Sequence, residues 1–288
     1  MKIQQPQYEI WEQRPGEIGI YQQIERAGRV CYKSEDHTTE DSAKPFVGRM
    51  IDNEHYAMLE HGTVYLTCNH GELPLYLTNR FSRVNTVDGK DYITTNLRVL
   101  AENHSLADLS YLSDYIPEKH ELRITVHFTT QIAITREYNR HRANSMAEQS
   151  TRYCNYTKNK FGNEITINLP TWVESQQKET SEAHFPTLCQ QIAEGKDAAW
   201  SKLEYWYFAN LAAEYAYMKL IEAGCKPQEA RVVLPLDTNT ELVHTAFITD
   251  WKHFFDLRAF GTTGAPHPDA KTLAGPLYQE FKQRGYLK

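Results

Sequence analysis

The segment richest in side chains suited to chemistry is residues 140–153, which reads RHRANSMAEQSTRY. It contains three arginines, a histidine, a carboxylate, two amides and two serines. All of its cations are arginine or histidine, and the planar arginine fork suits paired contacts to phosphate or carboxylate oxygens. The short polar side chains add directional hydrogen bonds that have little value on a solvated face. The segment therefore indicates a site for an anionic ligand. The alternative is a solvated salt-bridge network with Glu137 and Glu148.

The elements around this segment follow from hydrophobic spacing. Residues 122–130 (LRITVHFTT) alternate and predict a strand, after which QIAITREYNRH changes to helical spacing. On that prediction Glu137, Arg140 and His141 share one helix face, at positions i, i+3 and i+4. ELVHTAFI is a second strand candidate, and 249–258 is expected to be a helix with a buried aromatic stripe.

Further helices are expected at 17–32, 40–59 and 197–223, and a short strand at 63–67. The helix at 197–223 is the strongest, with Gly224 as its stop, and Pro227 opens a short helix that carries Arg231. Residues 69–121 are polar and turn-rich, with a hairpin turn at NTVDGKDY and a short helix at TTNLRVLAE. The pattern predicts one α+β domain over residues 1–288, with a central, mostly antiparallel sheet flanked by helices.

Composition excludes several classes of protein. With 41% hydrophobic residues the chain can bury a substantial core, and a net charge of −6 argues against wholesale nucleic-acid or membrane binding. Five cysteines without a C-x-x-C pair suggest neither a disulfide framework nor a zinc site, and we expect no metal. Cys154, which follows Arg152 and Tyr153, is either a buried hydrophobe or a nucleophile in a cationic field. Without a signal peptide or membrane-length segment, the expected location is cytoplasmic.

The order Arg-His-Arg, seven residues, then serine resembles the signature of the flavin-dependent thymidylate synthases. Four more blocks resemble that family in its order: AGRVCYKSEDHTTEDSAKPFV, HYAMLEHGTV, EARVVLPLDTNTEL and WKHFFDLRA. The resemblance implies reductive methylation of dUMP to dTMP, with methylenetetrahydrofolate as the one-carbon donor. It further implies NADPH as reductant through bound FAD, and a homotetramer whose active sites are shared between subunits.

The resemblance also implies roles for individual residues. The implied FAD contacts are His61, Thr63, Arg140, His141, Arg142, Glu148 and His253. The implied dUMP contacts are Glu137, Arg140, Glu148, Gln149, Ser150, Thr151, Arg152, Arg231 and Arg258. Arg258 is the expected catalytic residue, because a cation beside the pyrimidine favours ionisation at N3 and enriches C5 in electrons. No protein nucleophile is required, so Ser150 is assigned to binding.

The chain departs from the family pattern at several places. Glu137 stands where glutamine is common, Cys31 where serine is common, and Phe247 where some members have a polar flavin contact. Residues 69–121 form an insertion that the shortest members lack, placed either over the active-site mouth or at a subunit contact.

Two other functions stay open at this stage. One is a nucleic-acid-binding module whose basic, aromatic surface includes Arg140, Arg152, Tyr153 and Tyr156, together with Arg142. The acidic net charge and the lack of a second basic stripe argue against it. The other is a protein that binds nucleotide and flavin without turnover, against which the presence of Arg258 argues.

Overall fold

The computed structural model describes residues 1–174 and 185–287. Contacts divide the chain into two units, and each is described by itself. Unit 1 contains Met1–Gln7, Thr129–Glu137 and the described part of Ser150–Thr240. Unit 2 contains Tyr8–Phe128, Tyr138–Gln149 and the chain from Glu241 onward. The fold class is α+β with mostly antiparallel strands flanked by helices, as the sequence predicts.

The main sheet has the strand order β2-β6-β9-β7. Its strands are β2 (Gln7–Trp11), β6 (Arg123–Gln131), β9 (Asn239–Phe247) and β7 (Ser145–Glu148). β7 pairs antiparallel with β9, which places Ser145 opposite Thr245. β6 and β9 are buried along almost their whole length, because helices cover both faces of the sheet. The strands predicted at 122–130 and at ELVHTAFI are confirmed.

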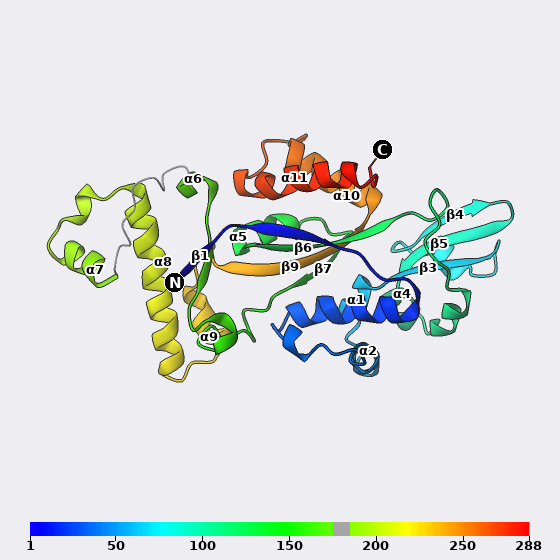
Figure 1. Cartoon of the computed structure of the whole chain (residues 1–288), viewed down its shortest axis with the longest axis horizontal. Coiled ribbons are helices and arrows are strands. Elements are labelled where there is room, and N and C mark those ends of the chain that lie inside the picture. The colour runs from blue at the N-terminus through cyan, green and yellow to red at the C-terminus, as the bar shows by residue number, and fades with distance from the viewer. Residues whose placement is uncertain (175–184, 288) are drawn as a thin grey trace. The chain divides into compact units, whose positions relative to one another are not determined.

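Helices α1 (Gly16–Val30) and α2 (Ala43–Asp52) lie on one side of this sheet, and α10 (Ile248–Phe255) and α11 (Pro268–Gln283) lie on the other (Figure 1). Between α10 and α11 a π-helical segment, η8 (Asp256–Phe260), carries Arg258. Trp251, Phe254 and Phe255 are buried, as expected for the predicted helix at 249–258.

The helix predicted at 40–59 is shorter than expected, because α2 ends at Asp52. Asn53 donates its side-chain amide to the carbonyl of Arg49 at 2.7 Å, and Glu54 is left-handed at φ +56°. The amide of His55 then returns to the carbonyl of Met50 at 2.8 Å, which closes the helix end. Residues Tyr56–His61 continue as a separate 3-10 helix, η2.

The insertion at 69–121 is part of the core of unit 2. It contains the end of β3 (Thr63–Asn69), then α3 (Leu75–Thr78), β4 (Arg83–Val87), β5 (Lys90–Asn96), α4 (Leu97–Glu102) and η3 (Leu106–Tyr111). The strands form an antiparallel sheet in the order β3-β5-β4. Asp88 and Gly89 both have positive φ, which confirms the predicted hairpin turn. Leu66, Ile93 and Leu97 pack in one cluster with Ile20 and Ile24 of α1.

Unit 1 is built around the long helix α8 (Lys202–Glu222). It also contains β1 (Lys2–Gln4) paired in parallel with β8 (Thr166–Asn168). Its other helical elements are most of α5 (Ile132–Tyr138), η4 (Asn159–Phe161), α6 (Thr171–Glu174), α7 (Phe185–Ala193), η6 (Asp197–Ala199), α9 (Pro227–Ala230) and η7 (Arg231–Val233).

Helix α8 begins later than predicted, because Ser201 and Glu204 form a capping box there. Gly224, at φ +97°, follows its end as expected. Leu203, Trp206 and Tyr217 of α8 join the core cluster of this unit. Arg231 lies in η7 and not in α9, where the sequence placed it.

A matched pair of glycines tests the packing at the start of α1. A Cβ on Gly19 would overlap the carbonyl oxygen of Arg14, whereas a Cβ on Gly48 of α2 would meet open space. Gly19→Ala should lower the free energy of unfolding by at least about 2 kcal/mol, because backbone must move. Gly48→Ala should leave it unchanged or raise it by roughly 0.5–1 kcal/mol. Urea denaturation measures both, and equal midpoints for the two variants would contradict the packing described here.

Candidate active site

The signature segment leaves its helix earlier than predicted. Helix α5 ends at Tyr138, so the prediction that Glu137, Arg140 and His141 share one helix face is wrong. The fully buried Tyr138 donates its hydroxyl to the carbonyl of Ala270 at 3.0 Å, which anchors the helix end. The amide of His141 bonds the carbonyl of Tyr138 at 3.1 Å, and this turn redirects the chain toward β7.

The structure brings Arg258 to the signature histidine. The Nε of Arg258 donates to Nε2 of His141 at 3.2 Å, and the ring of His253 meets His141 edge-on with centroids 5.6 Å apart. Burial, the Arg258 charge and the His253 ring together lower the pKa of His141 to about 4. His141 is therefore neutral near pH 7, and its Nε2 acts as the hydrogen-bond acceptor that orients the arginine.

Arg140 and Arg142 flank His141 with exposed side chains. Neither guanidinium forms an ion pair in the part of the chain that the structure describes. Glu148 accepts a hydrogen bond from the side-chain amide of Asn139 at 3.1 Å. Two exposed, uncompensated guanidiniums beside one buried neutral histidine form a donor set suited to phosphate groups. The alternative, a solvated salt-bridge network with Glu137 and Glu148, would need these two arginines, and neither of them takes part in an ion pair among the described residues.

Gln149 is held by Glu241, a residue that the sequence reasoning missed. The backbone amide of Gln149 donates to the Glu241 carbonyl at 2.8 Å, and its side-chain amide approaches Glu241 Oε1 at 3.4 Å. Glu241 also accepts from His127 Nε2 at 2.9 Å and forms an ion pair with Lys33. Burial alone would raise the pKa of Glu241, but the contacts with His127 and Lys33 lower it to about 2.

The remaining dUMP candidates, Glu137, Ser150, Thr151, Arg152 and Arg231, belong to unit 1. Arg231 donates to Thr151 Oγ1 at 3.1 Å across eighty positions of sequence. The amide of Arg152 donates to Ser150 Oγ at 3.3 Å. The guanidiniums of Arg152 and Arg231 are exposed. This unit therefore presents two cations beside two hydroxyls, while the roles of these residues stay predictions.

Cys154 has a fully buried side chain, as expected for a small hydrophobe. A nucleophile must reach its substrate, so burial argues against the nucleophilic alternative. Cys31 contacts Met58 Sδ at 3.8 Å, and Phe247 has the guanidiniums of Arg83 and Arg123 at 4.6 and 5.5 Å from its ring.

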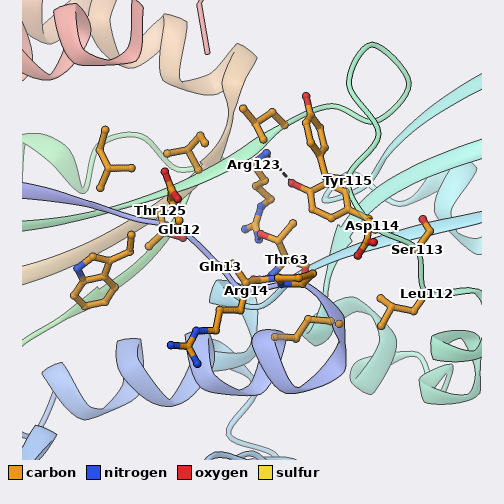
Figure 2. Close-up of a pocket in the computed structure, with 18 of the residues that line it drawn as sticks. Glu12, Gln13, Arg14, Thr63, Leu112, Ser113, Asp114, Tyr115, Arg123 and Thr125 are labelled. Atoms are coloured by element: carbon orange, nitrogen blue, oxygen red, sulfur yellow. Dashed lines mark hydrogen bonds between the residues drawn. The ribbon is translucent and has the colours of Figure 1, made fainter. Parts of the chain in front are cut away.

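The two predicted flavin contacts at the start of β3 differ in their surroundings. His61 is fully buried: its Nδ1 bonds Thr245 Oγ1 at 2.8 Å, and its Nε2 has no partner among the described residues. Burial and the charge of Arg123 lower the pKa of His61 to about 3. Thr63 instead lines a cavity of about 400 Å³, where Figure 2 shows it beside Arg123.

The described residues contain no group of three or more His, Cys, Asp or Glu placed to hold a metal ion. None of the helices within residues 1–174 and 185–287 is long and apolar enough to cross a membrane.

Exposed arginines around a buried neutral histidine are suited to the binding of anionic small molecules. Residues 119–284 match the family described as thymidylate synthase complementing protein. The match covers more than half of the chain and contains the whole signature, so the chain belongs to this family, the flavin-dependent thymidylate synthases. The resemblance noted in the sequence is thereby confirmed, and the chain is a thymidylate synthase-type enzyme.

No curated protein matches the chain. Among solved structures it is similar to the UMP/dUMP methylase PolB from Streptomyces cacaoi bound with 5-Br dUMP. The TM-score is 0.43 at 15% identity, over 98% of this chain and 93% of that chain. For the same methylase bound with 5-Br UMP the TM-score is 0.44 at 14% identity, over 98% and 92% of the two chains. Because both scores are low, the assignment rests on the family match.

The carboxylate of Glu241 provides a test by pH. An acid whose pKa is lowered on folding stabilises the protein above its unfolded pKa, and this contribution is lost as the pH falls. Between about pH 5 and pH 2 the protein should lose up to about 3 kcal/mol from this group. Near pH 7 the Glu241→Gln variant should have a lower free energy of unfolding than wild type. Between about pH 5 and pH 2 it should lose less of that free energy than wild type does, as measured by urea denaturation. Glu222→Gln on α8 is the control. Identical acid profiles for wild type and Glu241→Gln would refute the ion pairing described.

Proposed function

We propose that this protein catalyses the reductive methylation of dUMP to dTMP, with methylenetetrahydrofolate as one-carbon donor and NADPH as reductant through FAD. The observation that carries the proposal is the family match, which spans the signature at 140–150 as well as Arg231 and Arg258. The proposal includes dUMP and folate as the small-molecule partners, a homotetramer with shared active sites, and a cytoplasmic location.

The cations and hydrogen-bonding groups around His141 fit FAD chemically. Its pyrophosphate needs cations, and Arg140 and Arg142 are exposed without ion-pair partners in the described chain. His253 is exposed next to His141 and extends the same polar surface. When bound, the flavin supplies the reducing hydride for the transferred carbon. Arg140, His141, Arg142 and His253 would hold it.

Arg231, Thr151, Arg152 and Ser150 are proposed to bind dUMP. The contact between Arg231 and Thr151 fixes one guanidinium beside a hydroxyl, and each charged hydrogen bond to a phosphate contributes roughly 1.5–3 kcal/mol. Ser150 offers its hydroxyl next to the Arg152 amide. These groups can bind and orient a nucleotide without a metal ion.

Arg258 is proposed to activate the pyrimidine. Neutral His141 accepts a hydrogen bond from Nε of Arg258 and so orients the guanidinium. A cation at the pyrimidine edge favours loss of the N3 proton, which raises electron density at C5, the carbon that receives the methylene. This route needs no cysteine nucleophile, in agreement with the buried Cys154.

The activity itself is tested by release of tritium from C5-labelled dUMP. The purified protein should be yellow with FAD and should release label only when dUMP, methylenetetrahydrofolate and NADPH are all present. Omission of each component in turn is the control. Protein that takes up no FAD and releases no label would overturn the proposed function.

The role of Arg258 is tested separately from flavin binding. Arg258→Ala should keep the flavin absorbance yet lose about 10²–10³-fold in methylation rate, as expected for loss of an electrostatic contact to the reacting group. Arg284→Ala, which removes an exposed arginine on the last turn after α11, is the matched control and should retain full activity. A fully active Arg258→Ala enzyme would show that the activation role is wrong.

A further inference from the structure

The cavity that contains Thr63 lies wholly within unit 2 and holds about 400 Å³. Three parts of the chain form it: the loop between β2 and α1, residues 112–115 of the insertion, and the first residues of β6. Figure 2 shows Leu112, Ser113, Asp114 and Tyr115 along one side, with Arg123 and Thr63 next to them and Glu12 on the other side. A cavity of this size accommodates a small organic molecule.

Arg123 supplies an unusual buried cation to this cavity. Its side chain is 8% exposed, and its two terminal nitrogens donate to the Glu60 carbonyl at 2.7 Å, Ser145 Oγ at 2.7 Å and Thr63 Oγ1 at 3.4 Å. Its Nε has no partner, and no carboxylate of the described chain forms an ion pair with it. Its hydrogen-bond partners are all neutral oxygens, and the nearby charges of Glu60 and Asp250 only partly offset the cost of desolvation. Burial accordingly lowers the pKa of Arg123 to about 10.

The walls of the cavity suit an apolar or aromatic body. Tyr65 and Tyr115 face each other at a tilt, with ring centroids 5.3 Å apart. Trp11 and Ile124 are buried and lie among the lining residues. Tyr65 also accepts the backbone amide of Arg123 at 3.4 Å, so the aromatic wall is tied to the strand that carries the cation.

The charges around the cavity favour a single negative charge on the ligand. The four formally charged lining residues are Glu12, Arg14, Asp114 and Arg123, so the lining is neutral overall. Glu12 is already engaged by Arg284 at 2.8 Å, while Asp114 is exposed at the rim. A monoanion would be attracted by Arg123, whereas the carboxylates of Glu12 and Asp114 in the same lining would disfavour a second negative charge on the ligand.

Most of the lining lies outside the part of the chain that the family explains. The β2–α1 loop, Thr63, Tyr65 and residues 112–115 all precede residue 119, where the family match begins. Of the residues implied as flavin or dUMP contacts, Thr63 is the one that the cavity shares. The N-terminal loop and the insertion therefore supply much of the lining, and the first residues of β6, which the family match covers, supply the buried cation.

We propose that this cavity binds a small organic monoanion, an aromatic or aliphatic body with one carboxylate, whose charge is met by Arg123 and whose body packs against the wall formed by Tyr65 and Tyr115. The proposed site shares only Thr63 with the implied flavin and dUMP contacts, and its recognition uses none of the signature arginines. The insertion thus forms one wall of a ligand site.

Benzoate is the probe, followed by saturation-transfer NMR on the full chain. We expect a dissociation constant of about 1 mM or lower, and binding of the neutral isostere benzamide at least about tenfold weaker. Leu112→Trp should fill the cavity and weaken benzoate about tenfold or more, whereas Tyr111→Ala, which alters an exposed insertion residue outside the lining, should not change it. Arg123→Gln should abolish the preference for benzoate over benzamide. If that variant does not fold, Leu112→Trp carries the test.

Several outcomes would overturn the proposal. Equal affinity for benzamide and benzoate would remove the role of Arg123, and unchanged benzoate binding in Leu112→Trp would place the probe elsewhere. Loss of binding in Arg140→Ala would assign the probe to the signature arginines. Inorganic phosphate that displaces benzoate with equal affinity would refute the preference for a carboxylate. Because the readout is binding, none of these results depends on whether the protein methylates dUMP.

Discussion

The interaction on which most of the structure depends is the burial of the Glu241 carboxylate. A charge removed from water is costly unless partners satisfy it, and Glu241 meets this need through Lys33, His127 and Gln149. These partners come from the end of α1, from β6 and from the signature segment. The chain can therefore close around Glu241 only when all three segments have reached their places. The ring of Trp11 stacks on His127 with centroids 4.7 Å apart and brings β2 into the same arrangement.

Desolvation keeps His61 and His141 neutral. His61 and His141 are buried near Arg123 and Arg258, so burial and cationic charge both favour the neutral ring. A neutral imidazole can accept a hydrogen bond, and His141 uses this capacity to orient Arg258. Protonation would replace that bond by repulsion between two cations. The structure therefore supports a role of His141 in orienting Arg258 over a role as a proton carrier.

The sequence predicts elements with strong periodicity and misses those that tertiary contacts define. β6, β9 and α8 carry long hydrophobic patterns and were predicted, whereas β2 is five residues long and α11 contains Pro276, which hides its helical signal. The fold class and the cations of the candidate site can thus be predicted from the sequence. Glu241 was not, because its partners His127 and Lys33 lie 114 and 208 positions away. Nothing in ELVHTAFI indicates that one carboxylate in a buried strand will be paired.

The insertion folds locally and packs within unit 2 without using the residues of the signature segment as its core. A hairpin closed by Asp88 and Gly89 folds locally, and Leu66 and Leu97 pack against α1. The stability of the insertion therefore does not require changes in the signature segment. Once it is packed there, it removes Arg123 from water. A buried guanidinium without a carboxylate costs free energy that an anionic ligand would recover. Had the cation served structure alone, an apolar side chain or a paired carboxylate would satisfy the same strand at lower cost. A buried guanidinium that lines a cavity and forms no direct ion pair among the described residues is therefore the strongest physical reason to propose that the insertion is part of a binding site.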